Sequence, residues 1–162
     1  MIQLNLSPLT ESATLLRRAG VVLGSVGLTA IYSLLILLRA LFGQLNRPIV
    51  DKYCREWSAA LLRLVRASLT VRGEVPDFGD GRRYIIMCTH ASHYDIPVSF
   101  VSLPGSIRML AKKELFSIPL LGQAMRAAEF PSVDRSNRTR AVRDLAKARE
   151  MMESGIVLWA AP

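Results

Sequence analysis

A run of twenty residues without a charge, Ala19 to Leu38, most restricts how this chain can fold. Arginines flank the run, with Arg18 before it and Arg39 after it. About 20 apolar residues in a helix are enough to cross the hydrocarbon core of a bilayer. The same run also fits a buried helix or one that lies in the membrane plane. We expect membrane association, and the flanking arginines leave the orientation open.

Composition agrees with a membrane or phosphate partner. The 162 residues are enough for one domain with a sizeable core, 51% of them are hydrophobic, and the net charge is +8. A basic excess suits nucleic acid, an anionic membrane surface or a phosphorylated substrate. Nucleic acid is the weakest of these, because the basic residues are dispersed and aromatic residues make up only 7%. Cys54 and Cys88 show neither disulfide nor metal-ligand spacing, and we expect both to be reduced.

A second, amphipathic helix is predicted over residues 47–68, after a break at Asn46-Arg47-Pro48. We expect it to pack on the domain that follows. The alternative is that it lies among lipid headgroups with Trp57 near the boundary. The chain is thus predicted to have three parts: residues 1–46 with the membrane helix at about 19–38, the linker helix 47–68, and a globular part at 69–162.

In the globular part, short apolar runs alternate with helical stretches. Strands are predicted at 69–72, 84–88, 107–111, 130–133 and 156–160, with 84–88 as a buried strand. Helices are predicted at 96–103, at 114–127 with an interruption at Pro119, and from Ser136-Asn137 to about residue 154. This alternation indicates an α/β fold in which helices cover central strands.

Both histidines of the chain, His90 and His93, follow the predicted strand 84–88, and Asp95 comes five positions after His90. Side chains at this end of a strand point into the crevice where α/β proteins bind ligands. A carboxylate can orient an imidazole so that it removes a proton from a hydroxyl near neutral pH. On spacing alone, a loop histidine beside a helix-capping aspartate is the commoner case. No serine or cysteine nucleophile motif accompanies the pair, so a base here would act on a substrate hydroxyl.

Basic residues follow two other predicted strands. Lys112 and Lys113 end the strand 107–111, where lysines either bind phosphate as point charges or are simply solvated. Arg135 follows the strand 130–133, and arginine suits bidentate phosphate recognition. The alternative for Arg135 is a surface ion pair with Asp134. Ser136-Asn137 offers a helix cap, and the helix start beside it also favours an anion.

Together and in this order, these blocks resemble the glycerolipid acyltransferase family, specifically the 1-acylglycerol-3-phosphate (lysophosphatidate) acyltransferases, over about residues 47–162. The segment from His90 to Asp95 resembles the family's H-x-x-x-x-D block. Lys113 to Gly122 resembles K-E-L-x-x-x-P-x-x-G, and residues 133–137 resemble the block around D-R. Thr89 replaces the asparagine that commonly precedes the histidine, and we expect this to alter only a supporting hydrogen bond.

The segment from Gly155 to Pro162 resembles the strand and proline that open the family's F-P-E-G-T-R block, and the sequence stops at that proline. We therefore expect residues 69–162 to be the N-terminal part of an acyltransferase domain, weakly active or inactive, without the residues that help to bind the acceptor phosphate. We also expect an exposed sheet edge.

The resemblance implies acyl transfer from acyl-CoA or acyl-carrier protein to the free hydroxyl of 1-acylglycerol 3-phosphate, which forms phosphatidate. It implies His90 as the base, Asp95 as its orienting carboxylate, Lys113 and Arg135 as ligands of the acceptor phosphate, and no metal or other cofactor. It also implies membrane lipids as partners, at the inner (cytoplasmic) membrane with the catalytic domain facing the cytoplasm.

A membrane-anchored module that binds anionic lipids without catalysis is the alternative. It would keep the apolar run at 19–38 and use the arginines Arg138, Arg140 and Arg143, but it gives His90 no role. Acyl transfer that depends on His90 distinguishes the two hypotheses.

Overall fold

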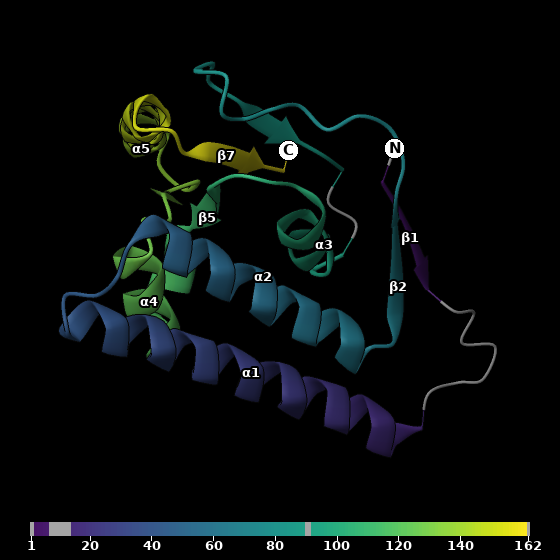
Figure 1. Ribbon diagram of the computed structural model, residues 1–162. Coiled ribbons are helices and arrows are strands. Elements are labelled where there is room, and N and C mark those ends of the chain that lie inside the picture. The colour runs from purple at the N-terminus through teal and green to yellow at the C-terminus, as the bar shows by residue number, and fades with distance from the viewer. Residues whose placement is uncertain (1, 7–13, 90–91, 162) are drawn as a thin grey trace.

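Two long helices form an antiparallel hairpin along one side of the molecule in the computed structural model, which describes residues 2–6, 14–89 and 92–161 (Figure 1). They are α1 (Leu15–Leu41) and α2 (Arg47–Leu64), so both predicted helices are confirmed. Asn46 caps α2, because its side chain accepts a hydrogen bond of 3.0 Å from the N–H of Ile49. The helix α1 is long and apolar enough to cross a membrane by length and composition.

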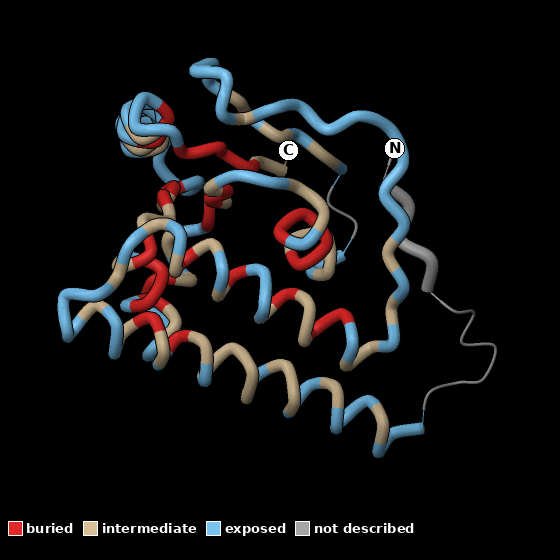
Figure 2. Tube along the Cα trace, in the orientation of Figure 1, coloured by how far each residue is buried: buried red, intermediate tan, exposed pale blue. Residues whose placement is uncertain are grey.

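The two helices of the hairpin have different surroundings (Figure 2). The inner helix α2 packs on the α/β layer, chiefly on α3 (Asp95–Ser102), and buries one face. In the outer helix α1, the buried residues are Ser33 and Ile36, and many large apolar side chains are exposed. Trp57 donates a hydrogen bond of 3.1 Å to Thr29 Oγ1 on α1, so it lies between the two helices. The prediction that the second helix packs on the domain is confirmed.

Two ion pairs fasten α2 to the α/β layer. Arg47 binds both carboxylate oxygens of Glu129, at 2.7 and 2.9 Å. Asp51 accepts from Arg108 Nη1 at 2.7 Å and from Ser106 Oγ at 2.5 Å. The Arg108 side chain is fully buried, and its Nε also donates to the carbonyl of residue 128 at 2.7 Å. A buried guanidinium requires such partners, since removal of one leaves an uncompensated charge.

Five short parallel strands form the central layer. In the three-stranded sheet the order is β3 (Ile85–Met87), β7 (Val157–Ala160), β4 (Ile107–Met109), with β7 in the middle. After Leu110, the chain continues as β5 (Ala111–Lys112), which pairs with β6 (Ser132–Val133). Every pair is parallel, so the residues that follow β3, β7, β5 and β6 lie at the same edge. The predicted strand 107–111 is therefore divided at Leu110 into two strands, β4, which pairs with β7, and β5, which pairs with β6.

The remaining elements surround this layer. They are the 3₁₀ helix η1 (Lys113–Ser117), α4 (Leu121–Ala127), α5 (Arg138–Glu153), and the antiparallel pair of β1 (Ile2–Leu6) and β2 (Ala67–Val71). The predicted α/β class is confirmed. The predicted strand 69–72 pairs with β1 and takes no part in the central layer.

The prediction of a buried strand at 84–88 is wrong in one respect. The strand β3 exists, but it lies at the edge of the three-stranded sheet, and the side chains of Ile85 and Met87 are 56% and 71% exposed. Ile86 between them packs on the core. An unbroken apolar run shows no alternation of apolar and polar residues. It therefore cannot distinguish a strand that is buried on both faces from one that is buried on a single face, and the sequence pattern overstated the burial.

Candidate active site

Polar residues from three of the predicted blocks lie at the carboxyl edge of the parallel strands. Asp95 begins α3 after β3, Lys113 follows β5, and Arg135 follows β6. Ligands of α/β proteins bind in the crevice at this edge. His90, the predicted base, lies outside the described residues, so its pairing with Asp95 stays a prediction.

Asp95 is held by the loop in front of its helix. Its carboxylate Oδ2 accepts a hydrogen bond of 2.8 Å from the backbone N–H of Ser92. Its own N–H donates to the carbonyl of Ser92 at 3.1 Å. Asp95 is the first residue of α3, one position before the predicted helix 96–103. These two hydrogen bonds fix the carboxylate against the loop that follows β3.

Asp134 is the buried centre of the third block, a position that the sequence pattern did not reveal. Ser136 donates to Asp134 Oδ1 from its hydroxyl at 2.6 Å and from its N–H at 3.1 Å. Lys113 Nζ donates to Oδ2 at 2.9 Å. Chiefly through Ser136, and then through Lys113, these contacts hold the pKa of Asp134 well below its usual range. The carboxylate is therefore charged at neutral pH.

The alternative interpretation of Arg135, a surface pair with Asp134, is not what the structure shows. Asp134 pairs instead with Lys113 and, at 3.5 Å, with Arg140. Arg135 is exposed, and among the described parts of the chain it has no hydrogen bond or ion pair. The two predicted phosphate ligands thus differ: Lys113 holds the protein's own carboxylate, and Arg135 is available to an external anion. Asn137 caps α5, as the sequence predicted.

The block from Lys113 to Gly122 ends in a strained turn. Leu120 has φ +64° and ψ −56°, and Leu121 N–H donates to the carbonyl of Pro119 at 2.7 Å. This is a γ-turn with a positive φ at its central residue, which is rare in proteins. A Cβ on Gly122 would lie 2.1 Å from the carbonyl oxygen of Phe116, so only glycine fits there. The predicted helix 114–127 is accordingly divided into η1 and α4.

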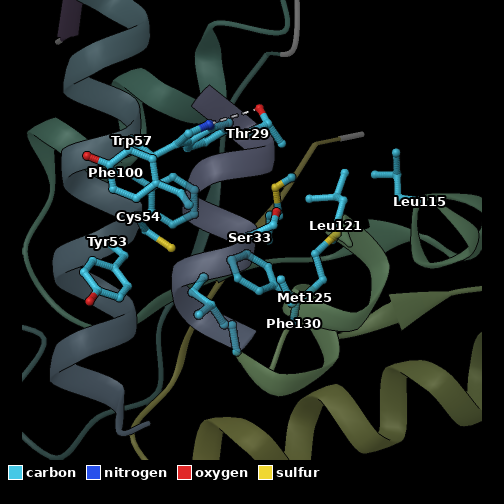
Figure 3. A pocket seen from close by; sticks show the side chains of 15 residues that line it. Thr29, Ser33, Tyr53, Cys54, Trp57, Phe100, Leu115, Leu121, Met125 and Phe130 are labelled. Atoms are coloured by element: carbon cyan, nitrogen blue, oxygen red, sulfur yellow. Dashed lines mark hydrogen bonds between the residues drawn. The ribbon is translucent and has the colours of Figure 1, made fainter. Parts of the chain in front are cut away.

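An apolar cavity of about 260 Å³ lies between the hairpin and the α/β layer (Figure 3). Its walls come from both hairpin helices, from α3 and from α4, so no single stretch of sequence reveals it. Residues shown there include Thr29, Ser33, Cys54, Phe100 and Met125. Burial raises the pKa of the Cys54 thiol to about 12, so the thiol stays protonated and unreactive. Cys54 and Cys88 are both free, as expected.

The parallel layer with its polar carboxyl edge defines an α/β domain, and comparison with known proteins identifies its family. A profile of the Acyltransferase family matches residues 68–162, from β2 to the end of β7. By this match, the chain belongs to the Acyltransferase family.

One curated relative adds a more specific likeness. It is a 1-acyl-sn-glycerol-3-phosphate acyltransferase of Cocos nucifera, which is 30% identical over 99 residues. The matched region covers 60% of this chain and 31% of the relative, so the match spans about a third of the relative's length. No solved structure matches the chain.

Proposed function

We propose that this chain transfers an acyl group from acyl-CoA or acyl-carrier protein to the free hydroxyl of 1-acylglycerol 3-phosphate, forming phosphatidate. Membership of the Acyltransferase family supports acyl transfer, and the name of the Cocos nucifera relative supports the acceptor. The observation that carries the proposal is the shared edge: Asp95, Lys113 and Arg135 follow parallel strands at one end of the layer.

In the proposed reaction, His90 removes the proton from the acceptor hydroxyl, and the oxygen attacks the thioester carbonyl carbon. The C–S bond then breaks, and the leaving thiolate takes the proton back from His90. Asp95 orients the imidazole and stabilises its protonated form, a role supported by the hydrogen bond that Ser92 donates to this carboxylate. The mechanism uses no metal or other cofactor.

We assign the acceptor phosphate to Arg135 first. Its guanidinium is exposed and has no partner among the described residues, and the fork of an arginine matches a phosphate in bidentate geometry. Lys113 takes a supporting role. Its ammonium is half-buried, donates to Asp134 and Ser136, and keeps a third N–H for the phosphate.

We propose that the hairpin attaches to the membrane with α1 in the membrane plane. Along its length α1 is packed on α2, which carries charged residues such as Lys52, Arg55 and Glu56. A transverse span would bring those charges into the hydrocarbon region, at about 2.5–3.5 kcal/mol per charged side chain at the centre. In-plane attachment buries the exposed apolar side of α1 and leaves the charges of α2 on the protein side.

The membrane contact extends beyond the hairpin in this proposal. Ile118 and Leu120, at the strained γ-turn, are also exposed, and their loop borders α1 at Val26, Thr29 and Ala30.

The division of the chain into residues 1–46, 47–68 and 69–162 stays part of the proposal. We also retain the inner membrane, with the catalytic domain on the cytoplasmic side, as the proposed location.

The test is an acyl-transfer assay that follows the release of free thiol from acyl-CoA in the presence of lysophosphatidate. We expect His90→Ala to abolish the release and His93→Ala, the matched control, to leave it unchanged. Equal release by the unmodified chain and His90→Ala would contradict the assigned base. No release by the unmodified chain, together with binding to anionic vesicles, would favour the lipid-binding module instead.

A further inference from the structure

We propose that Ser99 and Trp159 position the Asp95 carboxylate, an inference that rests on the function proposed above. The indole Nε1–H of Trp159 donates to Ser99 Oγ at 2.9 Å. The Ser99 hydroxyl in turn donates to the backbone carbonyl of Asp95 at 2.8 Å. One hydroxyl therefore connects the central strand β7 with the first turn of α3. Neither residue touches the reacting atoms in this proposal, so both act through Asp95.

The connection is buried in an apolar environment. The exposed fraction is 8% for Ser99 and 4% for Trp159, and the neighbouring Phe100 and Val157 are buried as well. A phenylalanine would fill such a site without any polar atom. Buried polar groups need hydrogen-bond partners, and the indole N–H of Trp159 has the Ser99 hydroxyl as its partner. This hydrogen bond can form only when α3 and β7 are correctly placed relative to each other. Together with the packing of α3 on α2, the pair therefore helps to fix the rotation of α3 about its axis.

Ser99 adds to the hydrogen bonds that Ser92 makes with Asp95, because it ties the first turn of α3 to the central sheet as well as to the preceding loop. The helix has eight residues and no side-chain hydrogen bond at its N-cap. Trp159, by contrast, is paired on both sides, with Ile86 of β3 and Met109 of β4. Through the two hydrogen bonds of Ser99, the central strand β7 thus restrains the turn that carries the Asp95 carboxylate. A displacement of that turn would move Asp95 relative to the proposed base, His90.

The same helix contains a natural control. Ser102 Oγ donates to the carbonyl of Val98 at 2.6 Å, the same bond to the fourth preceding residue that Ser99 makes. The chain has two tryptophans, and their indole N–H groups donate to Thr29 and Ser99 rather than to Ser102. Ser102→Ala therefore removes a comparable hydroxyl from α3 without cutting the connection to β7.

The kinetic test compares Ser99→Ala, Trp159→Phe, their double variant and Ser102→Ala. We expect Ser99→Ala and Trp159→Phe each to lower kcat about tenfold, while KM for both substrates changes less than about twofold. The double variant should lose no more than the worse single variant, because both cut one chain of hydrogen bonds. Ser102→Ala should retain wild-type kinetics, and Ser99→Thr, which keeps the hydroxyl, should restore most of kcat.

The pH profile separates positioning from simple loss of stability. A misplaced carboxylate stabilises the imidazolium less, so the pKa of the base falls and the acidic limb of kcat moves to lower pH. We expect this shift in Ser99→Ala and Trp159→Phe, but not in Ser102→Ala. Additive losses in the double variant, a change in KM alone, or an unmoved acidic limb would overturn the inference.

A second measurement does not depend on activity. The N–H of Ser92 donates to Asp95 Oδ2, so its amide hydrogen exchange reports on the placement of the carboxylate. Exchange at Ser92 should become faster in Ser99→Ala and Trp159→Phe and stay unchanged in Ser102→Ala. Unchanged exchange in all three variants would refute the positioning role. This holds whether or not the unmodified chain transfers an acyl group. Absence of acyl transfer by the unmodified chain would refute only the proposed function.

Discussion

The outer helix α1 and the carboxyl edge of the strands both expose side chains without a partner in the part of the protein that the structure describes, but the side chains are of opposite kinds. In α1 the exposed side chains are apolar, with Leu16 86% and Leu23 72% accessible. At the strand edge the exposed group is a guanidinium, that of Arg135, while the neighbouring Asp134 is buried and paired. The acceptor proposed above, lysophosphatidate, has the same two parts, an apolar chain and a charged phosphate.

The difference also concerns what holds each region in place. The strand edge is fixed by hydrogen bonds to backbone and carboxylate groups, as at Asp95 and Asp134. The hairpin is fixed by apolar packing and by the two ion pairs of α2, Arg47 with Glu129 and Asp51 with Arg108. A substitution confined to the hairpin or to the strand edge therefore tests whether the other region changes in stability or binding.

The largest effect is expected for Asp51→Ala, which leaves the Arg108 guanidinium buried without its carboxylate. Loss of one partner of a buried pair costs about 3–5 kcal/mol of unfolding free energy. The control is Glu56→Ala, which removes an exposed pair with Lys52 at 3.9 Å and should cost no more than about 0.5 kcal/mol. Urea denaturation of both variants measures the difference. Equal costs would show that the Asp51–Arg108 pair does not hold the hairpin on the α/β layer.

A smaller effect is expected for Arg135→Ala, which perturbs the strand edge only. Loss of a charge-assisted contact to phosphate should raise KM for lysophosphatidate about 10- to 100-fold and leave KM for acyl-CoA nearly unchanged. Arg138→Ala, an exposed arginine in the first turn of α5, is the matched control. Steady-state kinetics with each substrate varied in turn make the measurement. If only the acyl-CoA constant moved, Arg135 would belong to the donor site.

The hairpin is tested by replacing two exposed apolar residues of α1, in Leu23→Ser with Ile31→Ser. We expect binding to anionic lipid vesicles to weaken about tenfold, or about 1.4 kcal/mol. Each side chain would contribute about 1.5–3 kcal/mol if it were buried completely, and a helix in the membrane plane buries its apolar side chains only in part. Val142→Ser with Leu145→Ser removes residues of similar exposure from α5. Sedimentation with vesicles compares the two pairs of substitutions. A similar loss in both would mean that attachment is not specific to the hairpin.

The smallest effect concerns pH and the Arg47–Glu129 pair. The hydrogen bond from Arg47 lowers the pKa of Glu129 from its ordinary 4.5. Since the folded pKa lies below the unfolded one, the stabilisation is present above about pH 4.5 and is lost as the pH falls through the folded pKa. Glu129→Gln should therefore reduce the unfolding free energy at pH 7 and have less effect near pH 3. The pair is partly exposed, so we expect at most about 1 kcal/mol.

The sequence predicted the positions of helices and strands better than the pairing of the strands and the packing of the elements. The length of the run at 19–38 and the apolar spacing of 47–68 are local properties, and both helices are where they were expected. Which strand lies at the edge depends on residues far away, so the exposure of Ile85 and Met87 was not predicted. The same holds for β2, whose partner β1 comes from the start of the chain.

The site shows the same division. The sequence placed Asp95 at a helix start and Arg135 after a strand, because each follows from neighbouring residues. It did not predict that Lys113, more than twenty positions away, reaches Asp134, nor that Trp159 hydrogen-bonds to Ser99 across the core. Those contacts depend on the register of β5 with β6 and on α3 packing near β7.

The middle strand of the sheet is the last of its members to be synthesised. β7 spans residues 157–160, whereas its two neighbours come from residues 85–87 and 107–109. On the ribosome, β3 and β4 therefore emerge with no strand between them, at about 5–20 residues per second. The apolar hairpin has emerged long before that. We expect the growing chain to meet the lipid surface first and to complete its central layer there, so that the order of translation protects the apolar surface from aggregation.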